Sequence, residues 1–123
     1  MYLLINNKKL EIKEAISFKD RLYGLMGKIN INYGMLFPNC NSIHTFFMKE
    51  NIDIIGIDKD NVVIYKYENL PKNQIIKINN KVNETSVLEL PTGYGKYIEI
   101  NKKIEFKNWL LKSVLFFKCK YII

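Results

Sequence analysis

Residues 54–67, IIGIDKDNVVIYKY, decide the fold class of this chain. An apolar run is followed by the polar tetrapeptide DKDN at residues 58–61, and then by β-branched and aromatic residues from Val62 to Tyr67. Asn61 tolerates a positive φ angle, while β-branched and aromatic residues favour strands. The segment therefore predicts two strands joined by a tight turn, which is an antiparallel hairpin.

Similar short apolar runs recur on both sides of this hairpin. The sequence predicts further strands at residues 2–5, 10–16, 35–37, 42–48, 74–78, 86–90 and 104–106. Asn6 and Asn7 separate the first two runs, so these form a second hairpin. Many short strands with frequent turn residues are typical of a mainly β protein. We expect a compact antiparallel β-sandwich or barrel with one or two short helices.

One of these helices follows the first hairpin. Ser17 can cap its N-terminus with Asp20 three positions later, and either Gly24 or Gly27 can end it. Residues 92–100 can hold a second helical turn.

Length and composition indicate one domain. The chain has 123 residues, of which 48% are hydrophobic, enough for one core. We assign residues 1–106 to a single domain and residues 107–123 to a C-terminal extension. Two cysteines, Cys40 and Cys119, make no disulfide framework, and the start of the chain has no signal-peptide pattern. We therefore expect a cytoplasmic protein with reduced thiols.

The formal charge of +7 is concentrated near the C-terminus. The lysines of the main body are scattered among acidic residues, which argues against nucleic acid as a partner. Residues 107–123 contain four lysines, no acidic residue and many apolar side chains. We favour packing of this extension on the domain, on a protein partner or on a second copy. An anionic membrane surface is the alternative.

Five blocks of sequence resemble, in order and spacing, the family known as domain of unknown function 192 (DUF192). The blocks are RLYGLM at 21–26, GMLF at 34–37, CNSIHTFFM at 40–48, ID at 52–53 and VLELP at 87–91. The resemblance covers about residues 18–106 and implies a small β-rich fold, but no activity. Asn61 and Asn101 stand where the family usually has glycine, and Glu50-Asn51 stands where it has Phe-Pro.

His44 and Cys40 are the first candidates for chemistry. His44 is the only histidine, and strand alternation would place it on one face with Phe46 and Met48. This apolar setting favours a packed structural histidine over a catalytic one. Four residues of strand separate Cys40 from His44 by roughly 13 Å, whereas two zinc ligands lie about 4 Å apart. We expect no metal and no cofactor.

Arg21 is the only arginine in a lysine-rich chain. A guanidinium group can bind a carboxylate or phosphate through two parallel hydrogen bonds, which lysine cannot do. We favour a structural salt bridge from Arg21 to Asp53, Asp58 or Glu89 over this binding role.

No complete catalytic constellation is present, so we name no catalytic residue. The leading hypothesis is a small binding or interaction module. The alternative is a small-ligand-binding protein or enzyme with a pocket lined by Arg21, Cys40, His44 and Asp53, because these polar residues lie within otherwise apolar blocks. A third hypothesis is peripheral membrane attachment through residues 107–123.

Overall fold

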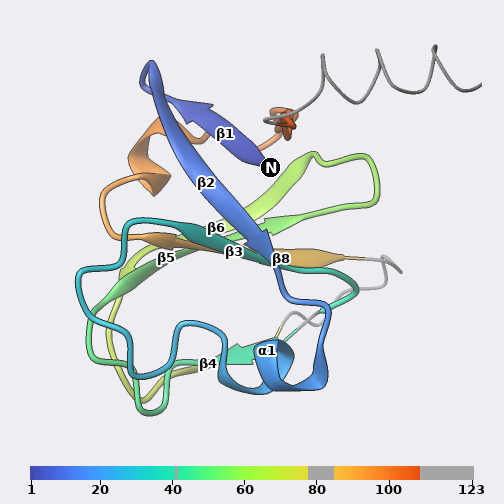
Figure 1. Cartoon of the computed structure of the whole chain (residues 1–123). Helices are drawn as coiled ribbons and strands as arrows, with labels where there is room; N and C mark the ends of the chain where they lie inside the picture. The colour runs from blue at the N-terminus through green and yellow to red at the C-terminus, as the bar shows by residue number, and fades with distance from the viewer. Residues whose placement is uncertain (41, 78–84, 109–123) are drawn as a thin grey trace, which may run out of the picture.

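A computed structural model describes residues 1–40, 42–77 and 85–108 (Figure 1). Its centre is a six-stranded sheet in the order β1-β2-β3-β8-β5-β6, which curls so that the β1–β2 hairpin rises above the rest. The strands are β1 Tyr2–Ile5, β2 Lys8–Glu14, β3 Gly34–Phe37, β8 Ser86–Pro91, β5 Ile52–Ile57 and β6 Val63–Leu70. The expectation of a mainly β, barrel-like fold is confirmed.

Three smaller elements complete the fold. β4 (Ser42–His44) and β7 (Ile75–Lys77) form a separate two-stranded sheet. The helix α1 spans Phe18–Tyr23, and the 3₁₀ turn η1 spans Gly95–Tyr97. No helix among the described residues has both the length and the apolar character needed to cross a membrane.

Both predicted hairpins are present. Asn6 and Asn7 have φ angles of 51° and 61° between β1 and β2, and Asn61 has a φ angle of 62° between β5 and β6. Asp58 stabilises the second turn, because its Oδ1 accepts hydrogen bonds from the backbone N–H groups of Asp60 and Val62. These asparagines take the left-handed conformation that most other side chains avoid.

The two faces of the sheet bury two different cores. Along β5, Ile55 and Ile57 face an upper core beneath the β1–β2 hairpin and η1, whereas Ile52 and Ile54 face a lower core above α1 and β4 (Figure 1). The upper core also contains Leu3, Ile5, Leu10, Ile12, Val63, Leu88, Leu90, Ile98 and Ile104. The lower core also contains Ala15, Leu25, Met35, Phe37, Met48, Leu70 and Val87.

The helix α1 begins at the predicted N-cap, and it ends at the first of the two glycines that the sequence offers. Ser17 Oγ accepts a hydrogen bond of 3.0 Å from the backbone N–H of Asp20, which caps the N-terminus. Gly24 ends the helix with a φ angle of 50°. A β-carbon at Gly24 would lie 2.8 Å from Cζ of Phe37, so glycine allows the chain to turn directly beneath the sheet.

Three details differ from the sequence predictions. The β2–β3 pair is parallel, because the chain crosses beneath the sheet through α1 before it returns as β3. Residues 104–106 form no strand, and only isolated bridges join Val62 to Lys103 and Tyr2 to Lys107. The strand expected at residues 42–48 ends at His44.

Thr45 explains why β4 is so short. The Thr45 hydroxyl donates to the carbonyl of Pro71 and accepts from the backbone N–H of Gln74, so it fastens a turn at that point. Phe47 then takes a positive φ angle of 63°, which strand geometry excludes.

Candidate functional site

A cavity of about 90 Å³ lies beneath the sheet, between α1, the residues after it, β4 and β8. Its walls are largely apolar, and they include Leu25, Phe37, Ile43, Phe46 and Met48. The polar lining side chains include Arg21, Cys40, His44 and Glu89. A space of this size accommodates several water molecules or a short ligand.

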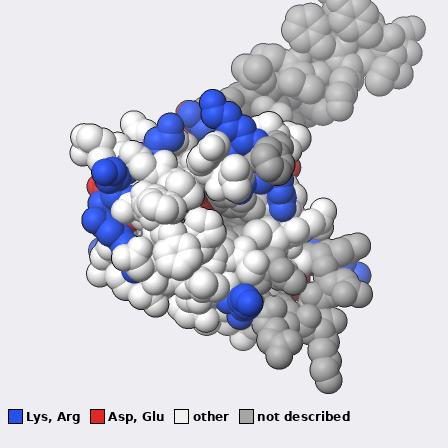
Figure 2. All heavy atoms as spheres, turned by 90° about the horizontal axis from the view of Figure 1, so that it is seen from below, with Lys and Arg blue, Asp and Glu red and all other residues white. Residues whose placement is uncertain are grey.

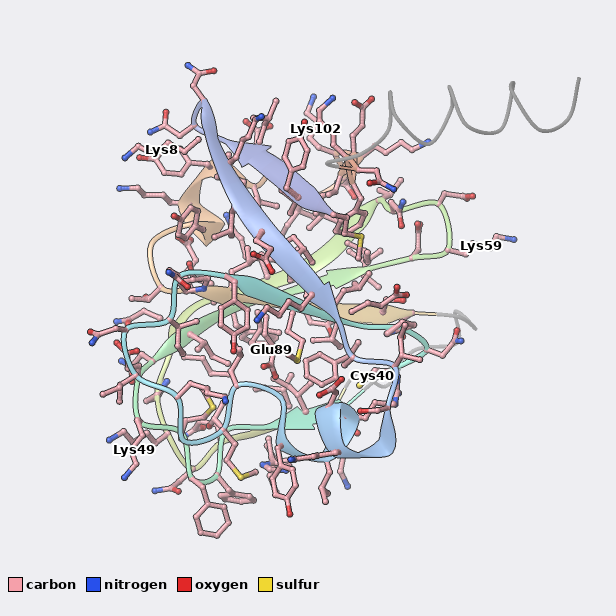
Figure 3. All side chains as sticks on the ribbon, in the orientation of Figure 1. Lys8, Cys40, Lys49, Lys59, Glu89 and Lys102 are labelled. Carbon is pink, nitrogen blue, oxygen red and sulfur yellow. The ribbon has the colours of Figure 1, made fainter. Side chains whose placement is uncertain are left out.

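Glu89 is the most unusual of these residues. It lies in the middle of β8 between Met35 of β3 and Ile54 of β5, and only 6% of its surface is exposed. Its Oε2 atom is buried and has no hydrogen-bond partner among the described residues. Figure 3 shows Glu89 and Cys40 in the layer between the sheet and α1.

The surroundings of Glu89 determine its protonation state. Burial raises its pKa to about 8, and the backbone N–H of Leu25, which binds the carboxylate, only partly opposes this effect. The carboxyl group is therefore mainly neutral at pH 7. A neutral carboxyl group can both donate and accept a hydrogen bond, so the unpartnered Oε2 atom is able to serve as a donor or as an acceptor.

Arg21 lines the same cavity from α1 but remains exposed. Its Nη1 donates a 2.8 Å hydrogen bond to the carbonyl of Pro38, which holds the guanidinium group at the edge of the cavity. Within the described part of the chain, Arg21 makes no ion pair, so the expected salt bridge to Asp53, Asp58 or Glu89 is wrong. That expectation assumed a buried arginine, whereas α1 presents Arg21 to solvent.

Cys40 and His44 both line the cavity without forming a reactive pair. The Cys40 thiol donates a 3.1 Å hydrogen bond to the carbonyl of Ser42, and the described residues show no hydrogen bond between Cys40 and His44. The His44 ring stacks on Phe46 with 5.3 Å between ring centroids. His44 is exposed rather than packed in the core. The described residues contain no group of three ligands that could hold a metal ion.

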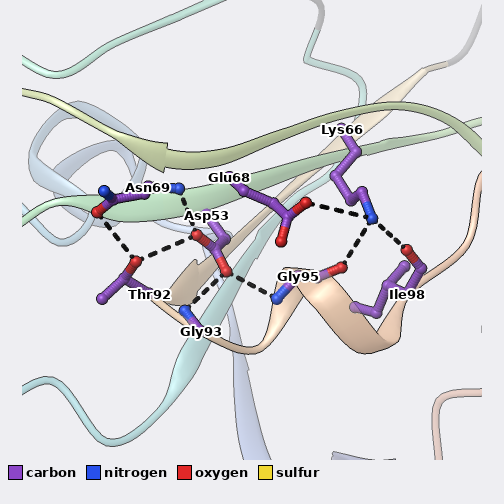
Figure 4. Close-up of polar contacts among 8 residues, drawn as sticks. All are labelled: Asp53, Lys66, Glu68, Asn69, Thr92, Gly93, Gly95 and Ile98. Atoms are coloured by element: carbon purple, nitrogen blue, oxygen red, sulfur yellow. Dashed lines mark hydrogen bonds and ion pairs between the residues drawn. The ribbon is translucent and has the colours of Figure 1, made fainter.

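Asp53 lies outside this cavity, which corrects the expected set of pocket residues (Figure 4). It points from β5 toward the loop after β8. One oxygen accepts from the backbone N–H groups of Gly93 at 3.0 Å and Gly95 at 2.7 Å. The other accepts from the backbone N–H of Asn69 at 2.7 Å and the hydroxyl of Thr92 at 3.4 Å. Asp53 therefore joins β5, β6 and this loop.

The same loop is held from β6 by Lys66. Its Nζ donates to the carbonyls of Gly95 at 3.1 Å and Ile98 at 2.8 Å, and it lies 3.6 Å from a carboxylate oxygen of Glu68 (Figure 4). The donors and acceptors of this network satisfy one another, so its role is structural.

A model of the DUF192 family, described as "Uncharacterized ACR, COG1430", matches residues 2–106. The chain belongs to the DUF192 family. A UPF0127 protein of Thermococcus sibiricus is 30% identical over 118 residues, which cover 85% of this chain and 75% of the relative. These comparisons confirm the family expected from the sequence, a family of unknown function.

Two solved structures share the DUF192 fold seen here. A proposed transcription regulator from Sinorhizobium meliloti 1021 has a TM-score of 0.68 at 23% identity, with 85% of this chain and 89% of that chain covered. A protein of unknown function from Novosphingobium aromaticivorans has a TM-score of 0.66 at 18% identity, with 85% and 82% covered. At these identities the comparison establishes a shared fold.

The sequence alone did not reveal the importance of Glu89. The sequence indicates it only as one of three salt-bridge partners for Arg21. A signal was nevertheless present, because Glu89 is the single charged residue in the DUF192 block VLELP at residues 87–91. Strand alternation places Val87 and Glu89 on the same face, and Val87 belongs to the lower core.

A larger hollow of about 600 Å³ lies between β1 and residues 97–107. Its lining combines apolar side chains with lysines and glutamates, and it contains no buried polar side-chain atom without a partner among the described residues. The hypotheses about the C-terminal extension concern residues 107–123. Of these, residues 109–123, which include Cys119, lie outside the described residues.

Proposed function

We propose that this chain is a small-ligand-binding module and that its ligand occupies the cavity beside Glu89. The observation that carries this proposal is the buried Oε2 atom of Glu89, a residue that lines the cavity, because this atom has no hydrogen-bond partner among the described residues. Leaving a buried polar group unsatisfied costs about 1–3 kcal/mol. A ligand that completes this hydrogen bond recovers much of that cost, which favours its binding.

Binding is a better supported role than catalysis. A cysteine nucleophile requires a base within hydrogen-bond reach, and the Cys40 thiol instead donates to a backbone carbonyl. His44 contacts Phe46 through its ring and shares no hydrogen bond with Cys40 in the described part of the chain. The cavity thus offers recognition groups without an activated nucleophile.

A screen of small polar fragments by protein-observed NMR tests the proposal. We expect at least one fragment to shift the backbone amides of residues 21–26 and 42–44. Glu89→Leu should abolish these shifts, whereas Glu11→Leu, an exchange at an exposed position in β2, should preserve them. Ser42→Trp, a change at an exposed position on the cavity wall, provides a second way to block the site.

Two results would contradict the proposal. One is a screen in which no fragment shifts the amides around the cavity. The other is fragment binding that survives both Glu89→Leu and Ser42→Trp in folded protein.

We also propose a cytoplasmic location and a single domain over residues 1–106. The free Cys40 thiol supports the first, because free thiols persist in reducing compartments. The family match over residues 2–106 supports the second. Cell fractionation tests the location, and cooperative unfolding of a chain truncated after residue 108 tests the domain boundary.

A further inference from the structure

We infer that the ligand of this cavity is a small carboxylate with a short apolar chain, bound between the Arg21 guanidinium and the Glu89 carboxyl group. The inference rests on the proposed binding function and specifies its ligand class. Three features of the site carry it: the charge of the lining residues, the hydrogen-bond donors that remain free, and the apolar walls.

The charge of the lining favours a single negative charge in the cavity. Among the described residues that line the cavity, only Arg21 and Glu89 have a strongly acidic or basic side chain. When Glu89 is neutral, the positive charge of Arg21 is not neutralised by any of these described lining residues. Figure 2 shows the molecule from the side of α1 and β4. Uncharged residues occupy most of this face, lysine and arginine residues surround them, and few atoms of aspartate or glutamate are visible. A monoanion matches this field, whereas a cation would be repelled by Arg21.

Free donors are available on both sides of the cavity. A guanidinium group has five N–H donors, and Arg21 uses one of its groups to bind Pro38. The remaining donors can bind the two oxygens of a carboxylate in parallel. Neutral Glu89 can donate its O–H to the same carboxylate. Because Arg21 and Glu89 line one cavity without forming an ion pair, a ligand group can lie between them.

The walls and volume determine the rest of the ligand. Leu25, Phe37 and Met48 are buried apolar residues of the lower core that line the cavity. A volume of about 90 Å³ limits the enclosed part of the ligand to a few heavy atoms. A phosphate is a poorer match, because it brings up to two charges and needs more donors than these apolar walls provide.

The pH dependence of binding follows from the two carboxyl groups. A carboxylic acid ligand with a pKa of about 4 is ionised above that pH. Glu89, whose pKa is raised to about 8, keeps its proton up to about pH 8. Binding should be strongest between these values and should weaken above pH 8, where two carboxylates would face each other. Among the described residues, the other titratable or charged groups that line the cavity are Arg21 and Tyr23 on the α1 side and Cys40 and His44 on the β4 side.

Isothermal titration calorimetry with propionate, propionamide and propylamine tests the ligand class. We expect propionate to bind at pH 7 and the amide and amine to bind at least tenfold more weakly. Arg21→Lys should weaken propionate binding at least tenfold, because lysine cannot form the two parallel bonds. Lys19→Gln, an exposed change on the same helix outside the cavity, should leave it unchanged.

Repeating the titration at pH 7, 8 and 9 isolates Glu89. Wild-type affinity should approach a tenfold loss per pH unit above pH 8. Glu89→Gln retains Cys40, His44 and Tyr23 but cannot ionise at position 89, so it should lose this dependence. An equal pH dependence in both proteins would contradict the role of Glu89.

The outcomes separate this inference from the proposed function. Tighter binding of propylamine than of propionate would overturn the carboxylate inference while preserving a binding cavity. A pair of short peptides, one ending in a free carboxylate and one in an amide, distinguishes the source of the carboxylate. Selective binding of the free-acid peptide, tighter than that of propionate, would identify a polypeptide C-terminus as the source. Absence of any cavity ligand in the fragment screen would instead remove the proposed function itself.

Discussion

Asp53 and Glu89 are buried acidic residues on adjacent strands of one sheet, with exposed fractions of 1% and 6%. In the pairing of β5 with β8, Asp53 lies opposite Leu90 and Glu89 lies opposite Ile54. The two carboxyl groups consequently point to opposite faces of the sheet. Asp53 accepts four hydrogen bonds, whereas Glu89 accepts one from Leu25 and has an unpartnered oxygen.

This difference shows that burial alone does not assign a role to an acidic residue. A buried carboxyl group is favourable to folding when donors surround it and unfavourable when they are missing. Asp53 therefore stabilises the fold, whereas the arrangement at Glu89 is costly to the unliganded protein, and we propose that it serves ligand recognition.

The largest effect should come from Asp53→Asn. The amide group that replaces one carboxylate oxygen is a donor, so it cannot accept from both pairs of donors around Asp53. We expect the free energy of unfolding in urea to fall by about 3–5 kcal/mol. Asp60→Asn, at an exposed turn position, should change it by less than about 0.5 kcal/mol. A loss below about 1 kcal/mol for Asp53→Asn would mean that the fold does not depend on the Asp53 carboxylate, which would contradict the proposed difference between Asp53 and Glu89.

The pH dependence of stability should reveal Glu89. Its pKa is raised by burial from 4.5 to about 8, so the unfolded chain releases this proton at lower pH than the folded protein does. The contribution of Glu89 to the free energy of unfolding is fully present below pH 4.5. It decreases as the pH rises and is lost above about pH 8. We expect the free energy of unfolding of the wild type to fall by about 2–3 kcal/mol relative to that of Glu89→Gln when the pH is raised from 5 to 7. Urea unfolding of both proteins at the two pH values measures this difference.

The comparison with Glu89→Gln cancels the titration of every other group. Parallel stability curves for the two proteins would mean that Glu89 has the same pKa in the folded and unfolded states. In that case the neutral donor in the cavity would be absent at pH 7.

A smaller effect should follow from Gly95→Ala beside Asp53. A β-carbon at Gly95 would lie 2.9 Å from Oδ2 of Asp53, so the carboxylate or the loop must shift. We expect a loss of about 1–2 kcal/mol in the free energy of unfolding. In an Asp53→Asn background the loss should be smaller, because the interaction that the alanine disturbs has already been damaged. Strictly additive losses in this double-mutant cycle would mean that Gly95 acts independently of Asp53.

Local structure was the part of the fold that could be predicted. The two hairpins and the capped helix α1 depend on neighbouring residues such as Asn61 and Ser17, whose conformational preferences are visible in the sequence. The parallel β2–β3 pair depends on strands separated by α1, and no local pattern specifies it. The end of β4 depends on the hydrogen bonds that the Thr45 hydroxyl donates to Pro71 and accepts from Gln74. Both partners are distant in the sequence, and single-sequence patterns do not connect them with Thr45.

The candidate site divides in the same way. Arg21, Cys40 and His44 line one cavity, and all three lie in blocks that support the family resemblance. The sequence groups Asp53 with them because it is also a polar residue in an otherwise apolar block, but its side chain faces the other side of the sheet. Only the position of β8 beside β5 shows that Glu89, rather than Asp53, lies above α1. Strand order and register decide which of the two acidic residues faces the cavity, and neither is encoded in local sequence.

The smallest effect should come from Arg21→Ala, measured by urea unfolding at pH 7. Arg21 is exposed and contributes one hydrogen bond to a backbone carbonyl, while alanine favours helices. We expect a change of less than about 0.5 kcal/mol in the free energy of unfolding. A loss above about 1.5 kcal/mol would assign Arg21 to the structural class of Asp53. A small loss leaves Arg21 free of a structural requirement, and a guanidinium group that the fold does not need is available for a ligand.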